Sequence, residues 1–386
     1  MSFQLTEEQR MIQTTVREFA RKEIEPIAAK GDRESVFPKE TLLKMAEMGL
    51  LGMMVPAEYG GAGLDTVSYA LAMQEVAYAC ASTSVIMGVN NLVCEPLFKF
   101  GTEAQKQKYL IPLARGKCIG SFALTEPGAG SDAGNQKTSA VPSAGPGTGL
   151  KDSFYILNGT KMFITSGSHA EVFITTAVTD KAVRHHGITA FIVEKGMPGF
   201  SVGKVEDKMG LRASDTAELI FENCRVPREN LLGKEGEGFK IMMIALDGGR
   251  IGIAAQSVGI AQACLDAAIG YAKKREAFGQ PIAEFQGIRW MIADMATEIE
   301  AARLLTLQAA QLKDQGLPFT KEASMAKLFA SEMVNRVAYK ALQIHGGYGY
   351  LKDFPVERYY RDARVTTLYE GTSEIQRNVI AKLILQ

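Results

Sequence analysis

The stretch IGSFALT at residues 119–125, followed by EPGAGSD at residues 126–132, decides the fold class of this chain. Residues 119–125 mix β-branched and aromatic side chains in a short run, which is typical of a strand. Residues 126–132 contain proline and glycine and form the loop that ends this run. The pattern of the chain changes at Cys118, from helical before it to strand-like after it.

The residues before this stretch follow a helical pattern. Thr6 is placed to cap an acidic first turn, after which apolar residues recur at helical spacing. Residues 66–100 contain few charges, which favours buried helices, and Pro96 predicts a helix boundary within them. A further short helix is expected at residues 102–110. We therefore predict an N-terminal helical domain at residues 1–117.

The residues after the stretch contain several short strand patterns separated by turn residues. These strands are expected at residues 154–157, 161–165, 172–178, 189–194, 200–204 and 216–222. Asn158-Gly159 is interpreted as the turn of a hairpin, and Ser139–Gly149 as a surface loop. Because no helices lie between the strands, we predict an antiparallel barrel or sandwich, not a βαβ sheet. This central β-domain is expected at residues 118–232.

Helical patterns return in the last part of the chain. Residues 239–274 are crowded with small and apolar side chains, which predicts a helix enclosed on most sides. An apolar stripe predicts a second long helix from Ile288 to Leu305, and a third is expected at residues 321–344. Long helices of this kind usually pack as an antiparallel bundle. We therefore expect a C-terminal four-helix bundle at residues 233–386, and a fold class that is mainly α with a central β-domain.

The composition argues against several kinds of function. Lysine plus arginine and aspartate plus glutamate both number 43, so no basic field would attract nucleic acid. The five cysteines show no C-x-x-C spacing, so neither a disulfide framework nor a metal site is indicated. We see no signal peptide and no apolar run of the ~18 residues that span a bilayer, which predicts a cytoplasmic protein without a membrane span. Nicotinamide, ATP, zinc-protease and hydrolase motifs are also missing.

The stretch YEGTSEIQ at residues 369–376 contains the candidate catalytic residue. Glu370 lies between an aromatic residue and a glycine, a setting that could raise its pKa toward neutrality and suit a general base. The alternative is an acidic residue beside the start of a final helix that Thr372 or Ser373 caps. From these residues alone, both interpretations stay open.

Three further segments could bind a ligand or could be structural. Phe163 could stack on a flat ring or pack in the core. Arg275 ends a run of three cations, which could bind a pyrophosphate or complement a helix dipole. His345, before Gly346 and Gly347, is expected to make a structural hydrogen bond at a helix end and not to act in catalysis.

Together, several collinear motifs resemble the acyl-CoA dehydrogenase family, over essentially the whole chain. The motifs are TEPGAGSD at residues 125–132, RxxFG at 275–279, QxxGGxGY at 343–350, RxxRDAR at 358–364 and YEGT at 369–372. Residues 89–91 and 246–252 are most similar to the short-chain, butyryl-type members. The resemblance implies a helical, β and helical three-domain fold that binds FAD. It also implies a homotetramer, a dimer of dimers in which each flavin contacts two subunits.

The resemblance also implies roles for individual residues. Glu370 matches the catalytic base. The positions around FAD are Phe122, Leu124, Thr125, Gly130, Ser131, Phe163, Ile164, Thr165, Arg275, Phe278, Gln286, Gln343, Gly346, Gly347, Thr372 and Glu374. The positions beside the acyl-CoA are Ser131, Asp247, Arg250, Tyr369 and Gly371. Several of the dinucleotide positions are implied to reach the flavin from a neighbouring subunit.

The implied reaction is oxidation of an acyl-CoA thioester to its trans-2-enoyl-CoA. Glu370 would remove the α-proton, its backbone N–H would help stabilise the developing enolate, and the β-hydride would pass to flavin N5. Electron-transfer flavoprotein would then accept the electrons. Some relatives carry the base on the helix where this chain has Gly249, which has no carboxylate, so Glu370 is favoured.

Two departures from the family pattern leave the acyl group open. Phe163 stands where many members have tryptophan, and Glu95 places a charge near the expected end of the acyl tail. Glu95 either faces solvent or lines the pocket, where it would favour a polar, branched or cyclic acyl group. The main hypothesis is a short-chain acyl-CoA dehydrogenase. The alternatives are a dehydrogenase of a glutaryl-, isobutyryl- or cyclohexanecarboxyl-CoA type of substrate, and a non-catalytic flavoprotein of the same fold.

Overall fold

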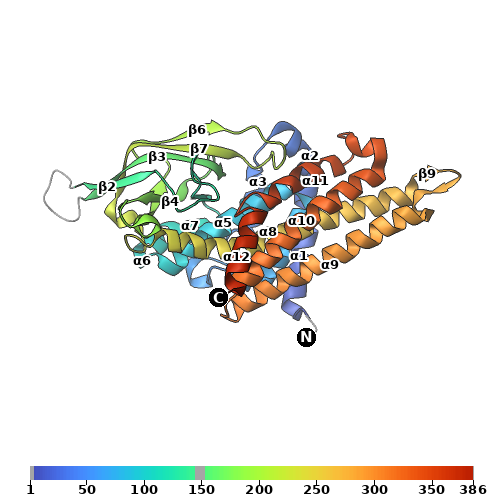
Figure 1. The fold of residues 1–386 in the computed structure, drawn as a ribbon, viewed down its shortest axis with the longest axis horizontal. Coiled ribbons are helices and arrows are strands. Elements are labelled where there is room, and N and C mark those ends of the chain that lie inside the picture. The colour runs from blue at the N-terminus through green and yellow to red at the C-terminus, as the bar shows by residue number, and fades with distance from the viewer. Residues whose placement is uncertain (1–3, 144–152, 386) are drawn as a thin grey trace.

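The computed structural model describes residues 4–143 and 153–385, and Figure 1 shows the predicted order of helices, strands and helices. The helices of the first part are α1 (Glu7–Phe19), α2 (Glu25–Glu34), α3 (Lys39–Glu47), α4 (Thr66–Ala79), α5 (Ala81–Phe100), α6 (Glu103–Gln105) and α7 (Ile111–Ala114). Single π-helical turns at Ala20–Ile24 and Lys106–Leu110 join α1 to α2 and α6 to α7. The side chain of Thr6 caps α1 in a capping box with Gln9, as predicted.

Pro96 does not end a helix, so that prediction is wrong: it lies inside α5. Proline at this position removes the N–H that would bind the carbonyl four residues earlier, which usually breaks a helix. Most residues of α5 are buried, among them Leu92, Val93 and Leu97 around the proline. Tertiary packing therefore outweighs the local cost of the proline.

The middle part is a β-domain. Its strands are β1 (Gly120–Ala123), β2 (Ser139–Ser143), β3 (Phe154–Thr165), β4 (Val172–Val178), β5 (Ile188–Glu194), β6 (Phe200–Val205), β7 (Thr216–Pro227) and β8 (Leu231–Leu232). They form one sheet in the order β6-β7-β3-β2-β4-β5-β8, with β1 also paired to β4. Most pairs are antiparallel, as predicted, but β1 runs parallel to β4, and β2 also meets β4 in parallel. The sheet is mixed because β2 and β3 lie between β1 and β4 in the chain and form the long connection that parallel neighbours need.

Two turn predictions in this domain are wrong. Asn158-Gly159 lies inside β3, which pairs with β7 along its length and absorbs a register shift at this point. A Cβ atom on Gly159 would lie 2.5 Å from Oγ1 of Thr138, so this glycine permits a close approach of strands and not a turn. Residues 139–143 form β2 where a loop was expected. The rest of that expected loop, 144–149, lies outside the described residues.

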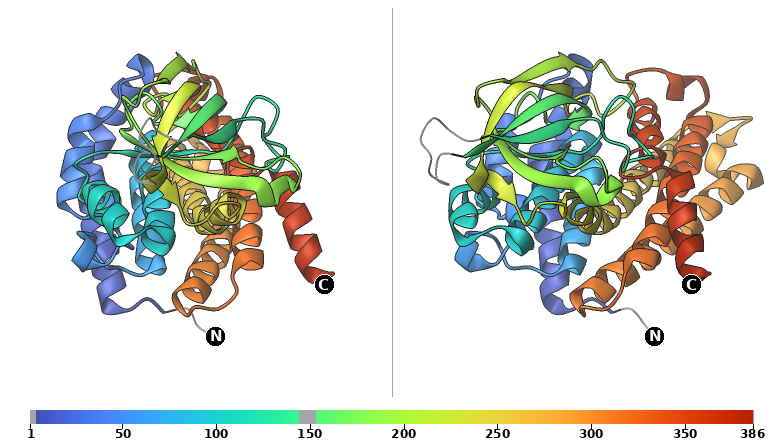
Figure 2. Two further views of the ribbon diagram at one scale, coloured as in Figure 1. Left: turned by 90° about the vertical axis from the view of Figure 1, so that its left-hand side faces the viewer. Right: turned by 60° about the vertical axis from the view of Figure 1, so that its left-hand side comes forward.

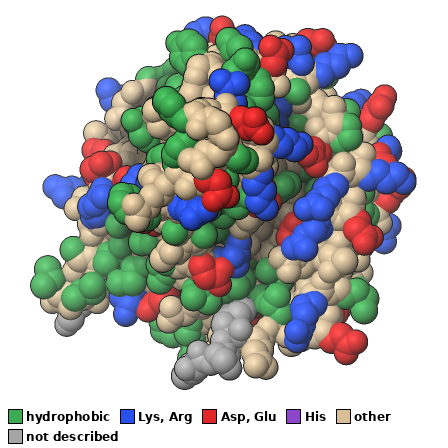
Figure 3. All heavy atoms as spheres, turned by 90° about the vertical axis from the view of Figure 1, so that its right-hand side faces the viewer, with side chains coloured by type: hydrophobic (Ala, Val, Ile, Leu, Met, Phe, Trp, Pro, Cys, Tyr) green, Lys and Arg blue, Asp and Glu red, His purple; other side chains and the backbone are tan. Residues whose placement is uncertain are grey.

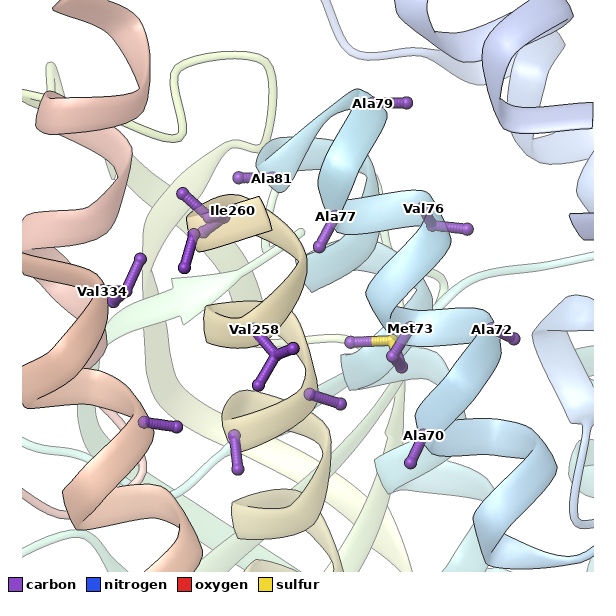
Figure 4. Packing of buried hydrophobic residues seen from close by; sticks show 14 of the residues in the cluster. Ala70, Ala72, Met73, Val76, Ala77, Ala79, Ala81, Val258, Ile260 and Val334 are labelled. Atoms are coloured by element: carbon purple, nitrogen blue, oxygen red, sulfur yellow. The ribbon is translucent and has the colours of Figure 1, made fainter. Parts of the chain in front are cut away.

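The last part contains the predicted long helices. Its elements are α8 (Gly238–Lys274), β9 (Glu276–Ala277), β10 (Gln280–Pro281), α9 (Gln286–Asp314), α10 (Thr320–His345), α11 (Val356–Arg364) and α12 (Ser373–Ile384). Figure 4 shows Val258 and Ile260 of α8 between the side chains of α4 and Val334 of α10. Among the described residues, only α8 is long and apolar enough to cross a bilayer, but 83% of its most apolar window is buried inside the fold. This burial is what a core helix shows.

The RxxRDAR motif at residues 358–364 joins all three parts. Arg361 on α11 donates to Oδ2 of Asp32 on α2 at 2.7 Å. Asp362 accepts the N–H of Leu211, from the loop between β6 and β7, at 2.6 Å. The β-domain lies against the helices of both other parts (Figure 2). These contacts fix the edge of the sheet relative to α11 and to the connection that follows it.

Candidate active site

Glu370 lies in the connection between α11 and α12, where the backbone has an unusual conformation. The φ angles of Glu370 and Gly371 are 50° and 88°, both in the left-handed region. Thr372 then caps α12, as predicted, because its hydroxyl accepts the N–H of Ile375 at 3.3 Å. A non-glycine residue in this conformation costs roughly 1–3 kcal/mol, so contacts around it must hold it in place.

Two side chains supply these contacts through the backbone carbonyls. The buried Lys327 of α10 donates from Nζ to the carbonyl of Gly371 at 2.7 Å. Gln376 of α12 donates from Nε2 to the carbonyls of Glu370 at 3.1 Å and Gly371 at 3.0 Å. Among the described residues, the N–H groups of Glu370 and Gly371 have no acceptor. The loop therefore has its carbonyls occupied and two of its N–H groups available.

The carboxyl group of Glu370 is buried, although the residue as a whole is only partly buried. Its Oε2 atom has no hydrogen-bond partner in the part of the chain that the structure describes. Burial raises the pKa of Glu370 to about 7, and the positive charges of Lys327 and Arg250 act in the opposite direction. A carboxyl group with this pKa and a free oxygen can accept a proton near neutral pH.

Gly249 on α8 provides the space for this carboxylate. A Cβ atom at position 249 would lie 2.2 Å from Oε2 of Glu370 and 3.1 Å from Cδ1 of Leu92. Gly249, which stands where some relatives carry the base, therefore lies directly against the carboxylate of Glu370.

A small cavity adjoins Glu370 between α4, α5 and α8. Its other lining residues are Tyr69, Met73, Val85, Gly88, Val89, Gly249, Gly252 and Ile253. The Tyr69 hydroxyl fits between two of these glycines, 2.7 Å from the Cβ position of Gly252 and 3.7 Å from that of Gly88. The cavity has a volume of about 10 Å³ and no charged lining residue other than Glu370. This is about the space of one water molecule, so any acyl group beside Glu370 requires the walls of the cavity to move.

Four other side chains were predicted to lie beside the acyl-CoA. Tyr369 is next to Glu370, and Asp247 and Arg250 lie on the facing helix α8. Arg250, which bears on the pKa of Glu370, donates to Asp247 at 2.7 Å. Tyr369 donates a hydrogen bond to Gln256 of α8. Ser131 is exposed in the loop that follows β1.

The solvent-facing interpretation of Glu95 is wrong. Its side chain is only 9% exposed, so it does not face solvent, and it does not line the cavity beside Glu370. It forms ion pairs with Lys313 of α9 at 2.9 Å and with Lys99 at 2.7 Å, and its Oε2 lies 2.5 Å from the Cβ position of Gly248. The partner Lys313 is far away in the sequence, so the sequence pattern could not reveal this pairing.

The first group of predicted FAD residues lies in two adjacent segments of the β-domain. Residues 122–131 follow or belong to β1, and residues 163–165 end β3. The N–H of Met162 donates to the carbonyl of Thr125 at 2.8 Å and joins the two segments. Phe163 has a φ of 59° at a break in the β3–β7 register and is 62% exposed, so the core-packing alternative is wrong. Ile164 and Leu124 are buried, so they can present mainly backbone to a ligand.

Sequence reasoning missed the ion pair that lies beneath these two segments. Lys161 is fully buried and donates to Oε1 of Glu126 at 2.7 Å and to the carbonyl of Leu124 at 3.1 Å. Glu126 in turn accepts the N–H groups of Lys137 at 2.6 Å and Thr138 at 3.2 Å. The available signal was weak: Lys161 lies inside a predicted strand, but β3 is buried on one face only, and a lysine in such a strand is expected on the exposed face.

The second group of predicted FAD residues lies at the opposite end of the chain's fold. A cleft of about 470 Å³ is lined by residues that include Arg275, His345, Gly346, Gly347 and Tyr348. The guanidinium of Arg275 lies 5.5 Å from the ring centre of Tyr348. His345 is buried and bonds to the Ala341 carbonyl at 2.8 Å, which confirms its structural hydrogen bond.

The two groups are not brought together within one chain. The β9–β10 hairpin, which carries the exposed Phe278 at its tip, projects away from the β-domain (Figure 1). Gln286 and Gln343 are exposed on the helices beside this end, whereas Thr372 and Glu374 lie near Glu370 at the start of α12.

Comparisons with known proteins identify the family of this chain. The N-terminal, middle and C-terminal domains of acyl-CoA dehydrogenases match residues 6–117, 121–224 and 236–385. The chain is 53% identical to the mitochondrial short-chain specific acyl-CoA dehydrogenase of Mus musculus, over 100% of this chain and 92% of that protein.

Two solved structures are similar over their full lengths. Butyryl-CoA dehydrogenase from Megasphaera elsdenii is 45% identical with a TM-score of 0.96, and 100% of each chain is covered. A chain from work on the electron transferring flavoprotein of Acidaminococcus fermentans is 51% identical, also with a TM-score of 0.96 and 100% coverage of both chains. This chain therefore belongs to the acyl-CoA dehydrogenase family and is an oxidoreductase with FAD as its cofactor.

Proposed function

We propose that this enzyme converts a short, apolar acyl-CoA to its trans-2-enoyl-CoA, with Glu370 as the base that removes the α-proton. The observation that carries the proposal is the buried, unpaired Oε2 of Glu370, which borders a small apolar cavity. A thioester α-proton is only weakly acidic, so a base with a pKa near neutrality suits its removal. Burial provides this pKa, and Lys327 and Arg250 keep it from rising further.

The backbone of the same loop can stabilise the charge that develops on the substrate. The N–H groups of Glu370 and Gly371 have no acceptor among the described residues. A thioester oxygen placed against them would accept hydrogen bonds as it gains negative charge, which lowers the barrier to proton removal. Tyr369 and Gly371, beside the base, and the Asp247–Arg250 pair, on the facing helix, are the other proposed contacts to the acyl-CoA. We add Ser131 in the β-domain loop to these contacts.

The surroundings of Glu370 favour an apolar acyl group over a dicarboxylic one. A dicarboxylic acyl group would bury a second carboxylate near Glu370, where the cavity offers no lining cation to pair with it. The similarity to a short-chain specific enzyme and to a butyryl-CoA dehydrogenase supports the same choice.

The residues present fit FAD in two places. Phe163 offers an exposed ring beside the loop of residues 122–131, and Arg275 lies over a cleft where Gly346 and Gly347 expose the backbone. When bound, FAD supplies the acceptor for the β-hydride. In our proposal Phe122 to Ser131 and Phe163 to Thr165 hold one end of the cofactor. Thr372 and Glu374, at the start of α12, are also proposed to contact FAD. The proposed contacts to the dinucleotide are Arg275, Phe278, Gln286, Gln343, Gly346 and Gly347.

We propose a homotetramer, a dimer of dimers, because the two groups of FAD residues lie apart in one chain. A neighbouring subunit would bring its Arg275 cleft to the flavin of the first. Phe278 is 94% exposed, and Trp290, Tyr339 and Tyr350 are exposed on the helices at the same end. Figure 3 shows that apolar side chains gather on this face between charged ones. An association that covers them would bury apolar area.

Three further expectations remain part of the proposal. Electron-transfer flavoprotein is proposed as the electron acceptor, supported by the similarity to a chain solved in work on such a flavoprotein. A cytoplasmic location is proposed from the sequence. The domain boundaries are proposed at residues 117/118 and 232/233.

The test of the proposed function is anaerobic mixing of the purified protein with a panel of acyl-CoA thioesters. Butyryl-CoA should bleach the flavin absorbance, and its kcat/KM should exceed those of glutaryl-, isobutyryl- and cyclohexanecarboxyl-CoA. No bleaching with any thioester would favour the non-catalytic flavoprotein. A higher kcat/KM for one of the other acyl groups would instead overturn the choice of substrate.

A further inference from the structure

Lys327 is a buried lysine on α10 that the proposed reaction does not require for proton transfer. It is fully buried, and within the described residues the hydrogen bond of its side chain goes to the carbonyl of Gly371 at 2.7 Å. A buried ammonium group without a carboxylate partner in hydrogen-bond range is costly, so its retention at this point needs a reason.

The contacts of Lys327 and Gln376 fix the direction of two peptide groups. In a trans peptide the C=O and the next N–H point in opposite directions. Gln376 binds the Glu370 carbonyl, so the Gly371 N–H points away from Gln376. Lys327 and Gln376 both bind the Gly371 carbonyl, so this peptide also cannot turn. The left-handed conformation of Glu370 is held by these bonds.

Several charged and titratable groups surround the carboxyl of Glu370. Lys327 reaches it from α10 and Arg250 from α8, where Asp247 pairs with Arg250; Tyr69 of α4 and Tyr369 are also near it. On the other side, Glu332 and Glu374 act on Lys327. Burial lowers the pKa of Lys327 to about 8, so it is largely charged at neutral pH. Arg250 shares its charge with Asp247, which leaves Lys327 as the cation near Glu370 without an ion-pair partner among the described residues.

We propose that Lys327 is a positioning residue for the catalytic base: its ammonium group holds the Glu370–Gly371 loop through the Gly371 carbonyl and favours the ionised form of Glu370. The inference rests on the proposed role of Glu370. Gln376 also holds the loop, but it is neutral, so it does not favour the ionised form of Glu370. The two residues therefore separate the effect of geometry from the effect of charge.

The test compares pH profiles of kcat for variants of the FAD-loaded enzyme with butyryl-CoA. Lys327→Met removes the charge and should move the acid limb of the profile upward by about one pH unit and lower kcat. Gln376→Leu should lower kcat by roughly 10- to 100-fold and leave the limb in place. The matched control is Lys340→Met on the same helix, where Nζ pairs with Asp294 at 3.2 Å and Glu298 at 3.4 Å. This control should show the wild-type profile.

An unmoved or lowered acid limb in Lys327→Met would overturn the inference, as would a shift of equal size in Gln376→Leu. If Lys327→Met fails to retain flavin, Lys327→Gln replaces it, since this variant loses the charge and keeps a donor. Its limb should also move upward. Glu370→Gln separates this inference from the proposed function. If that variant stays active, the proposed base is wrong, whereas an inactive Glu370→Gln with an unmoved limb in the Lys327 variants contradicts only the role of Lys327.

Discussion

A Cβ atom on Gly249 would lie 2.2 Å from Oε2 of Glu370, so the carboxylate occupies a space that any other residue at position 249 would fill. The two residues come from different elements, the first third of α8 and the connection before α12. Their proximity makes the glycine part of the site.

Gly249→Ala should displace the Glu370 carboxylate and lower kcat for butyryl-CoA by roughly 100-fold, because small misplacements of a reacting group are costly. The fold should persist, since alanine favours a helix by about 1 kcal/mol over glycine. Gly270→Ala is the matched control, because it lies on the same helix with nothing within 4 Å of its Cβ position. Steady-state kinetics and thermal unfolding check both variants. Wild-type kcat in Gly249→Ala would contradict the shared space.

The pKa of Glu370, raised to about 7 by burial, predicts the pH dependence of the reaction. The base must be ionised, so kcat should fall about tenfold per pH unit below pH 7. The effect on stability has the opposite sign: a raised carboxyl pKa stabilises the fold below pH ~4.5, and this contribution is lost as the pH rises through 7. Measurements of kcat and of the free energy of unfolding over the same pH range check both. An acid limb near pH 4.5 would show that the carboxyl is not buried during catalysis.

The pair Lys161–Glu126 should stabilise the segments proposed to hold FAD. Lys161→Met leaves the Glu126 carboxylate buried without its cation, which should cost about 3–5 kcal/mol of unfolding free energy and weaken FAD retention. The double variant Lys161→Met with Glu126→Gln should lose less. The pair Lys204–Glu206, whose lysine side chain is 71% exposed, serves as the control, and Lys204→Met should change stability by no more than about 1 kcal/mol. Equal losses in the single and the double variant would argue against coupling of the two residues.

Asp362, which binds the N–H of Leu211 in the β-domain, should make the free energy of unfolding depend on pH. Burial raises its pKa to about 6, so the folded protein retains a proton that the unfolded chain releases. The resulting stability is fully present below pH ~4 and is lost as the pH rises through 6, by about 3 kcal/mol at most. Asp362→Asn keeps an acceptor for the Leu211 N–H and cannot ionise. Its stability relative to the wild type should therefore rise over this window, and a constant difference would contradict the assignment.

The sequence predicted what depends on periodicity and on motifs. The long helices, the order of the three parts, the Thr6 and Thr372 caps and the family all follow from patterns that neighbouring residues form. Pro96 and Asn158-Gly159 were misjudged because a buried helix and a paired strand outweighed their local preferences. The parallel pairing of β1 with β4 depends on the path of the chain between them, which no local pattern records.

The parts of the site that the sequence could not show are contacts between distant segments. Lys327 belongs to an apolar helical pattern, and only the fold places its Nζ on the Gly371 carbonyl. Glu95 was expected either in solvent or in the acyl pocket. Its ion pair with Lys313 was not foreseen, because Lys313 lies on another helix. The role of Gly249 as space for a carboxylate likewise requires α8 and the Glu370 loop to be placed together.

Glu370→Gln shows most directly, in a single turnover, whether Glu370 removes the α-proton. The variant should retain FAD and bind butyryl-CoA, since the amide has nearly the same shape as the carboxyl. Rapid anaerobic mixing with saturating butyryl-CoA should bleach the wild-type flavin, while the variant should bleach at least 10³-fold more slowly, the upper part of the range for loss of a general base (about 10²–10⁴-fold). Bleaching of Glu370→Gln at the wild-type rate would contradict the proposed role of Glu370 and place the base elsewhere.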